Sequence, residues 1–314
     1  MNERTRSFLV SKFQDYYSQA ELRLPPEFTS REWGFLEFTT GDPFMRRHKE
    51  FGSQGELNDY LRGIGPAHAY YSVAYYEYPG APKMKEKNWL KADLIFDIDS
   101  DHLPGKINSY GDMLEKGKRE TLRLLDFLLD DFGFDESEVH AVFSGGRGYH
   151  FHISDSSVLP LESPERREIV DYISGKLSPE MHYTKEWMVG EHGSGTDTFK
   201  GKTAVPYKYT LKNYDTGWGK RIAHYIVQYL IAESVKEDKD MFRELRELKG
   251  FGKSTSKRFQ ELKKISKKPE VLKNIVDHGR LDFGHIDDFQ DVVSLLIKQA
   301  VESSKVNLGS TQVD

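Results

Sequence analysis

The sequence predicts an α+β fold, in which a mixed sheet with a β–α–β unit is accompanied by a helical insertion. Two segments with alternating apolar side chains, residues 93–99 and 141–153, predict strands. Between them, residues 109–132 predict a helix with one apolar side, formed by Leu122, Leu125, Leu129 and Phe132. A helix that joins two strands of one sheet brings them together although they are far apart in the sequence.

The segments before residue 93 predict a layer of helices and strands. Apolar residues at helical or alternating spacing, a Ser53-Gln54-Gly55-Glu56 capping box and the Gly41-Asp42-Pro43 turn mark its elements. In chain order we expect a helix packed on the core over 4–18, strands over 33–38 and 44–48, a short helix over 53–62 and a central strand over 68–76.

The second half predicts mainly helices. We expect them at 163–177, 220–235, 238–249, 256–266 and 289–303, with irregular structure over 178–220. Gly252-Lys253-Ser254-Thr255 has the end of a P-loop motif, but position 247 is Glu where that motif needs Gly, so we reject it. The expected organisation is a first part of an α/β core over 1–154, a helical or irregular insertion over 155–270, and a return to the core over 271–314.

Composition limits the possible classes of protein. The 314 residues, 37% of them hydrophobic, are enough for one large or two modest domains. There is neither an apolar run of about 18 residues nor an apolar start, so we expect a soluble, intracellular, cytoplasmic protein without a membrane segment. The absence of Cys excludes disulfides and thiolate zinc sites. A metal must bind oxygen or imidazole, which favours Mg²⁺ or Mn²⁺.

Net charge gives no sign of nucleic-acid binding. The chain carries 45 basic and 50 acidic residues, hence −5. Overall repulsion from phosphate predicts weak intrinsic affinity for nucleic acid, although a local basic groove is compatible with this charge. A partner subunit that holds the nucleic acid would compensate for weak binding.

The strongest candidate site is the pair Asp97 and Asp99. Alternate residues of a strand point to the same face, with Cα atoms roughly 6.5 to 7 Å apart, so both carboxylates can approach the same divalent ions. Without a cation the two carboxylates would repel each other. The alternative is a strand that ends in a polar loop, because Ser100, Asp101 and His102 follow directly.

A second candidate site is the segment Ser144-Gly145-Gly146-Arg147-Gly148-Tyr149-His150. Three glycines expose backbone N–H groups, and Arg147 adds a guanidinium, a combination suited to phosphate oxygens. An ordinary glycine-rich hairpin is the alternative. Carboxylates for metal and a cationic loop for phosphate together indicate phosphoryl transfer.

These segments resemble the catalytic small subunit of archaeal and eukaryotic DNA primase. The matching pieces, in family order and spacing, are Arg31-Glu32-Trp33-Gly34-Phe35, Phe96-Asp97-Ile98-Asp99, Asp130-Asp131-Phe132-Gly133-Phe134 and Ser144 to His150. The resemblance implies the archaeo-eukaryotic primase core with an RRM-like sheet. The cysteine-rich zinc module that this family usually inserts after the second aspartate has no counterpart here, so no zinc is expected.

The resemblance also implies residue roles. Asp97, Asp99 and the late aspartate Asp314 would hold two Mg²⁺ or Mn²⁺ ions, with the alternative that Asp314 is a terminal acid of no consequence. Ser144, Gly145, Arg147, Gly148 and His150 would bind the triphosphate, His150 as a donor or as a base. Glu32 would lie beside the active site, and Arg47 would assist nucleotide binding. In the family, a lysine and a histidine follow the late aspartate; we expect a truncated chain or a lineage without them.

The expected function is template-directed synthesis of short RNA or DNA primers on single-stranded DNA, with nucleoside triphosphates as substrates and a large primase subunit as partner. Three alternatives remain open. A gap-filling or repair polymerase of the same superfamily would extend primers but not start them, a two-metal nuclease would cleave single strands, and a noncatalytic module would bind nucleic acid without needing Asp97 or Asp99.

Overall fold

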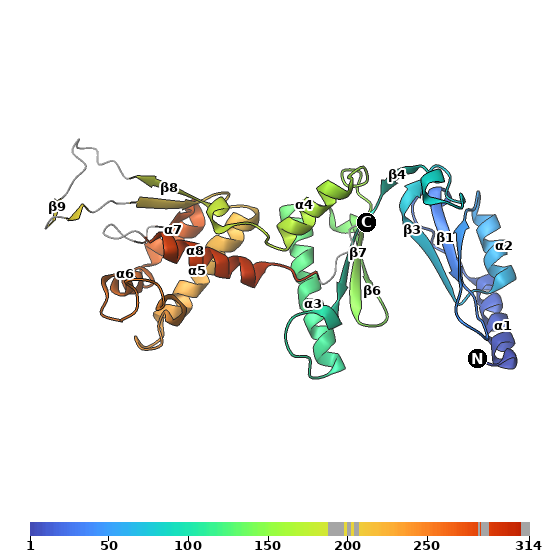
Figure 1. The fold of residues 1–314 in the computed structure, drawn as a ribbon, viewed down its shortest axis with the longest axis horizontal. Coiled ribbons are helices and arrows are strands. Elements are labelled where there is room, and N and C mark those ends of the chain that lie inside the picture. Colours follow the sequence, from blue (N-terminus) through green and yellow to red (C-terminus); the bar gives the residue numbers. More distant parts are fainter. Residues whose placement is uncertain (188–197, 200–201, 204–206, 282, 284–288, 309–314) are drawn as a thin grey trace.

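The structure is a computed structural model that describes residues 1–187, 198–199, 202–203, 207–281, 283 and 289–308. Three parts follow one another along the long axis of the molecule (Figure 1). A sheet with two helices forms the N-terminal part, a second sheet with two helices lies in the middle, and a helical part forms the opposite end. Among the described residues, no helix is long and apolar enough to cross a membrane.

The N-terminal part is an antiparallel sheet in the order β2-β1-β3-β4, with α1 and α2 on its outer side (Figure 1). Ser53 caps α2 as its sequence predicts, and Trp33 and Phe35 of β1 pack against Leu57 and Leu61 of α2. The first helix forms as expected and packs on this core through the partly buried Tyr17, although none of its residues is fully buried. The bounds are α1 Glu3–Gln19, β1 Arg31–Leu36, β2 Met45–Lys49, α2 Gln54–Ile64, β3 His68–Tyr76 and β4 Trp89–Ala92.

The middle part contains the two strands on which the sequence analysis depends. Its strand order is β5-β7-β6, with both pairs antiparallel and Asp97 directly opposite His150. Apolar residues of β5 and β7 are buried beneath α3 and α4, so the predicted alternation of faces is confirmed. The bounds are β5 Leu94–Asp99, α3 Tyr110–Asp126, β6 Val139–Phe143, β7 Gly148–Ile153 and α4 Ser163–Ile173.

The apolar side predicted for the helix over 109–132 is confirmed in part. Leu125 and Phe132 pack against the core, whereas Leu122 is 52% exposed. The fully buried residues of α3 are Met113, Gly117, Glu120, Thr121 and Leu124. Gly117 lies where α3 passes the end of β5, and a Cβ there would lie 2.0 Å from Ser100 Oγ. Only glycine allows this close approach.

The far end contains four helices and a three-stranded sheet in the order β12-β11-β8 among the described residues. The expectation of irregular structure over 178–220 is therefore wrong, because β8 and β11 form a regular antiparallel pair. The bounds are β8 Tyr183–Trp187, β9 Thr198–Phe199, β10 Lys202–Thr203, β11 Tyr207–Leu211, α5 Gly217–Ser234, α6 Lys257–Ile265, α7 Pro269–His278, β12 Arg280–Leu281 and α8 Gln290–Ser304.

The predicted helix over 238–249 is also wrong. Only a short 3₁₀ segment, Arg243–Leu245, forms there. Phe242 adopts a left-handed conformation with φ of 52°, and its backbone N–H donates to the carboxylate of Glu233 at the end of α5. A non-glycine residue in this region of φ interrupts a right-handed helix.

Hydrogen bonds join the segment after α8 to the middle part. After α8, the backbone N–H of Asn307 donates to Glu120 of α3 over 2.9 Å, and Val306 donates to the carbonyl of Ile173 over 3.2 Å. Residues 309–314, which include the predicted site residue Asp314, lie outside the described part.

Candidate active site

The open face of the middle sheet carries the predicted carboxylates. Asp97 Oδ1 lies 3.2 Å from His150 Nε2, and the two side chains are 54% and 35% exposed. Their strands place them opposite each other, so the contact follows from register alone. The structure thus brings together the first carboxylate and the histidine that the sequence places 53 positions later.

A second acidic group lies at the end of β5. Asp99, Asp101 and His102 each offer one ligand atom within 4.8 Å of the others. From the sequence alone, Asp101 and His102 are expected only as part of a polar loop. The signal for them is the continuation of acidic residues past the strand, where a 3₁₀ turn over Ser100–His102 folds the chain back towards Asp99. Carboxylate oxygen and imidazole nitrogen are suitable ligands for a divalent cation.

Two carbonyl groups of the glycine-rich hairpin between β6 and β7 accept hydrogen bonds from other segments of the chain. Tyr110 Oη donates to the Gly146 carbonyl over 2.6 Å, and the Ser100 N–H donates to the Arg147 carbonyl over 2.9 Å. Ser144 closes the hairpin, since its hydroxyl accepts from the Gly148 N–H over 3.1 Å. Within the described residues, the N–H groups of Gly145, Gly146 and Arg147 have no hydrogen-bond acceptor. The loop therefore presents donors to solvent, as an anion site requires.

Arg147 connects the hairpin with the acidic group. Its guanidinium forms an ion pair with Asp101, while the side chain stays 62% exposed. Gly148 is required for a structural reason, because a Cβ there would lie 2.5 Å from the Ile98 carbonyl. The hairpin and the end of β5 therefore form one surface that carries carboxylates, the Arg147 guanidinium and N–H groups without an acceptor among the described residues.

Asp97 and Asp99 line a cleft of about 730 Å³ between the middle and N-terminal sheets. The N-terminal sheet contributes Ser72, Ala74, Tyr76 and Trp89 to its wall. Leu308, which follows α8, also lines this cleft. Asp314, the third carboxylate expected from the sequence, lies outside the described residues.

Glu32 and Arg47 belong to the N-terminal sheet. The Glu32 side chain is 6% exposed and lies 3.2 Å from Arg47 Nε and 3.4 Å from Lys87 Nζ. Burial raises the pKa of Glu32, but the N–H of His48 and the charges of Arg47 and Lys87 outweigh burial, so the pKa lies below its ordinary value. Glu32 is thus a neutralised carboxylate that holds cations, including Arg47, in place.

A buried network fixes the junction of the two sheets. Asp93, between β4 and β5, accepts from Arg31 over 2.7 Å, from Tyr75 Oη over 2.8 Å and from Ser154 Oγ over 3.0 Å. Arg166 donates to the backbone carbonyl of Asp93 over 2.9 Å. These contacts tie both walls of the cleft to one point, so they set how the walls face each other.

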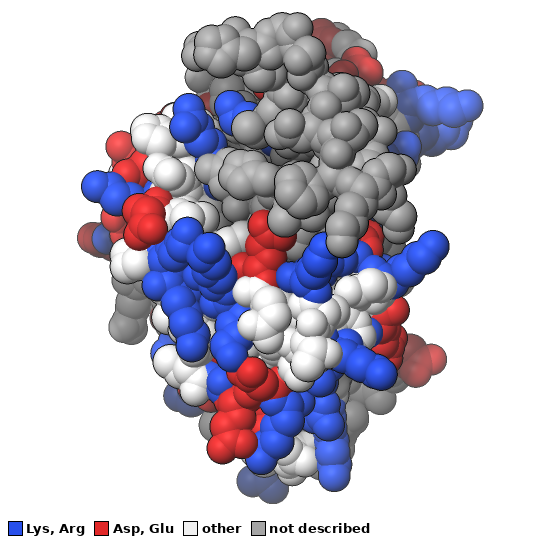
Figure 2. Space-filling model, turned by 90° about the vertical axis from the view of Figure 1, so that its left-hand side faces the viewer, with Lys and Arg blue, Asp and Glu red and all other residues white. Residues whose placement is uncertain are grey.

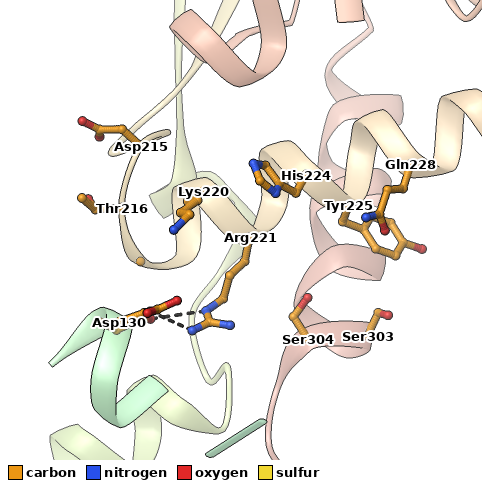
Figure 3. Close-up of a pocket in the computed structure, with 12 residues that line it drawn as sticks. Asp130, Asp215, Thr216, Lys220, Arg221, His224, Tyr225, Gln228, Ser303 and Ser304 are labelled. Carbon is orange, nitrogen blue, oxygen red and sulfur yellow. Dashed lines mark hydrogen bonds and ion pairs between the residues drawn. The ribbon is translucent and has the colours of Figure 1, made fainter. Parts of the chain in front are cut away.

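A second cavity, of about 460 Å³, lies between the middle part and the helical end. Figure 3 shows Arg221 extending from α5 towards the end of the α3 segment, where its guanidinium pairs with Asp131 at 2.8 Å. Tyr172 Oη also donates to Asp131, over 3.0 Å. Asp131 is therefore satisfied within the protein. The Asp130-Asp131 segment, one of the pieces noted in the sequence, joins two parts of the fold.

The fold and the cleft define a class of protein, the nucleotidyltransferases. Carboxylates on a sheet face beside an anion-binding loop are the arrangement that metal-assisted transfer of a nucleotide requires.

Comparison with known proteins identifies the family. Residues 96–278 match the family model described as DNA primase small subunit. The chain is 50% identical over 317 residues to the DNA primase small subunit PriS of Methanosarcina barkeri, covering 100% of this chain and 75% of that protein. It is 45% identical to the DNA primase small subunit PriS of Methanocella arvoryzae, covering 92% of this chain and 71% of that protein. The chain belongs to the DNA primase small subunit family, the catalytic primases that synthesise RNA primers.

Proposed function

We propose that this chain joins nucleotides on a single-stranded DNA template in the cleft between its two sheets, with Asp97 and Asp99 as the central carboxylates. The observation that carries the proposal is the placement of both carboxylates on the open face of β5, in contact with the cleft. Asp97 also faces His150 at 3.2 Å. Family membership supports the reaction, and the sheet geometry supports the residues.

The donor set fits divalent cations. Asp97 and Asp99 are about half exposed, so water and metal can reach their oxygens, and Asp101 and His102 add ligand atoms beside Asp99. Mg²⁺ or Mn²⁺ bound there would lower the pKa of an attacking 3′-hydroxyl and neutralise triphosphate oxygens. Because Asp314 lies outside the described residues, its part in the ligand set remains a proposal from the family resemblance.

The hairpin supplies the groups that hold the triphosphate. The N–H groups of Gly145, Gly146 and Arg147 have no acceptor among the described residues, and the Arg147 N–H points away from the Gly146 carbonyl that Tyr110 holds. Arg147 can exchange its ion pair with Asp101 for a phosphate oxygen once a cation occupies the acidic group. His150, beside Asp97, is placed to donate a hydrogen bond at the same end of the cleft.

A large primase subunit is the expected partner. The relatives are named small subunits, which supports such a complex. A partner that holds template would also compensate for the net charge of −5.

The test is primer synthesis on single-stranded DNA with Mn²⁺ and labelled nucleotides, with and without a large subunit. We expect products a few nucleotides long that disappear in Asp97→Ala. Full activity of that variant would refute the assignment of Asp97. Extension of added primers without any initiation would favour a gap-filling polymerase, and cleavage of the template without nucleotides would favour a nuclease.

A further inference from the structure

A strongly basic segment lies far from the candidate active site. Residues 249–273 contain nine Lys and Arg residues and two Glu, so the segment carries a formal charge of +7, whereas the whole chain carries −5. The remainder of the chain therefore carries −12. The segment covers α6 and the first part of α7, at the end of the molecule opposite the N-terminal sheet (Figure 1).

The fold turns the lysines of this segment outward. Phe259, Leu262 and Ile265 of α6 are buried, as is Phe251 before the helix. These apolar side chains fix the inner side of α6, so Lys257 and Lys264, seven residues apart, share the outer side two turns or roughly 10.5 Å from each other. Their separation follows from helical geometry and needs no particular side-chain rotamer.

Four of the exposed lysines carry uncompensated charge. Other cations of the segment are paired: Lys263 lies 2.6 Å from Asp238, and Arg258 forms an ion pair with Asp291. In the part of the chain that the structure describes, four exposed lysines of the segment form no ion pair, and we call them the lysine surface: Lys253, Lys257, Lys264 and Lys267. Repulsion among these positive charges destabilises the folded state unless an anion binds there.

Figure 2 views this end of the molecule directly. Lys and Arg side chains cover much of the surface below the grey residues, with fewer Asp and Glu side chains between them. No aromatic residue of the described segment is available for stacking, since Phe251 and Phe259 are fully buried. A ligand of this surface must therefore be recognised by its negative charge and not by its bases.

We propose that the lysine surface binds the phosphate backbone of the single-stranded DNA template outside the cleft. The proposal rests on the proposed function, because it assigns a second contact to the template of the same reaction. The surface and the cleft lie in different parts of the molecule (Figure 1), so a strand must be long enough to reach both. Binding at the lysine surface is sequence-independent, weakened by salt, and stronger for longer strands.

The test replaces all four lysines by Gln in the full chain. Binding of fluorescent oligo-dT of increasing length is measured by anisotropy at several salt concentrations. For long strands we expect at least about tenfold weaker binding at low salt and a slope of log K against log salt smaller by about 2 to 3, since each phosphate contact contributes about 0.7. The gain in affinity with strand length should disappear.

A matched control removes the same charge elsewhere. Arg4, Lys118, Arg119 and Arg167 are exposed, lie outside the segment and form no ion pair among the described residues, and their joint replacement by Gln should leave the length dependence intact. Circular dichroism and thermal unfolding of both variants establish that each is folded. An equal loss of DNA binding in both variants would show that only the net charge of the chain matters, which would overturn the proposal.

The remaining outcomes separate this proposal from the proposed function. Wild-type affinity of the lysine variant for long DNA, with weakened association to a large subunit, would overturn the proposal and assign the surface to a protein partner. Asp97→Asn should bind long DNA like the wild type and fail in synthesis. If Asp97→Asn is fully active while the lysine variant loses DNA binding, the catalytic role of Asp97 is refuted and the lysine surface is supported as a DNA-binding site.

Discussion

The two walls of the cleft present carboxylates in opposite ways. On the N-terminal sheet, Glu32 is 6% exposed and surrounded by Arg47, His48 and Lys87. On the middle sheet, Asp97 is 54% exposed and has a single histidine partner. Removing one partner of a buried ion pair leaves an uncompensated charge, whereas an exposed carboxylate is accessible to water and metal. The two carboxylates therefore differ in burial and in their cationic partners, and the role beside the active site that the sequence predicts for Glu32 stays a prediction.

The largest expected effect on stability comes from Glu32→Gln. It leaves the fully buried Lys87 without its carboxylate, so we expect a loss of about 3–5 kcal/mol in the free energy of unfolding. Asp97→Asn is the matched change on the other wall, and we expect it to alter stability by less than about 1 kcal/mol while it abolishes synthesis. Denaturant unfolding and primer synthesis measure the two effects. Equal destabilisation by both variants would remove the distinction between the walls.

A smaller effect should follow from Tyr110→Phe. The variant loses the hydrogen bond to the Gly146 carbonyl, worth about 0.5–1.5 kcal/mol. The hairpin would then be less well ordered, so we expect the KM for nucleotide to rise about 3- to 10-fold, while kcat and the melting temperature change little. Tyr78→Phe is the control, because this exposed tyrosine donates to neighbouring Glu77 instead. A fall in kcat at unchanged KM would argue against positioning of the triphosphate loop by Tyr110.

The smallest effect concerns His152, two residues after His150 on the same strand. Burial and the neighbouring His150 lower the pKa of His152 below its ordinary value of 6.5. The unfolded chain therefore takes up a proton at higher pH than the folded chain does, so stability should fall as the pH drops below about 6.5. His152→Asn should remove part of this loss in unfolding experiments between pH 7.5 and 5.5, conditions chosen to span about one unit on either side of that value.

His182 provides the comparison for that experiment, because burial lowers its pKa as well. His182→Asn should remove a separate share of the acid sensitivity. If neither variant changes the dependence of stability on pH, the acid sensitivity originates elsewhere in the chain.

The sequence by itself determined the alternation of β5 and β7. Strand period fixes which residues share a face, so Leu94 and Phe96 inside and Asp97 and Asp99 outside follow from local order alone. The cap of α2 at Ser53 is equally local. The family could be identified for the same reason, because its motifs are short segments whose spacing is visible in the chain.

Only the tertiary structure decided which polar groups meet. The bond from Tyr110 to Gly146 and the burial of Glu32 among cations depend on contacts between separate elements. The pairing of β8 with β11 and the exposure of Leu122 on α3 depend on such contacts too. Local periodicity predicts the face of a helix or strand from which a side chain projects. Which other side chain it contacts depends on how distant segments pack, and no local pattern encodes that packing.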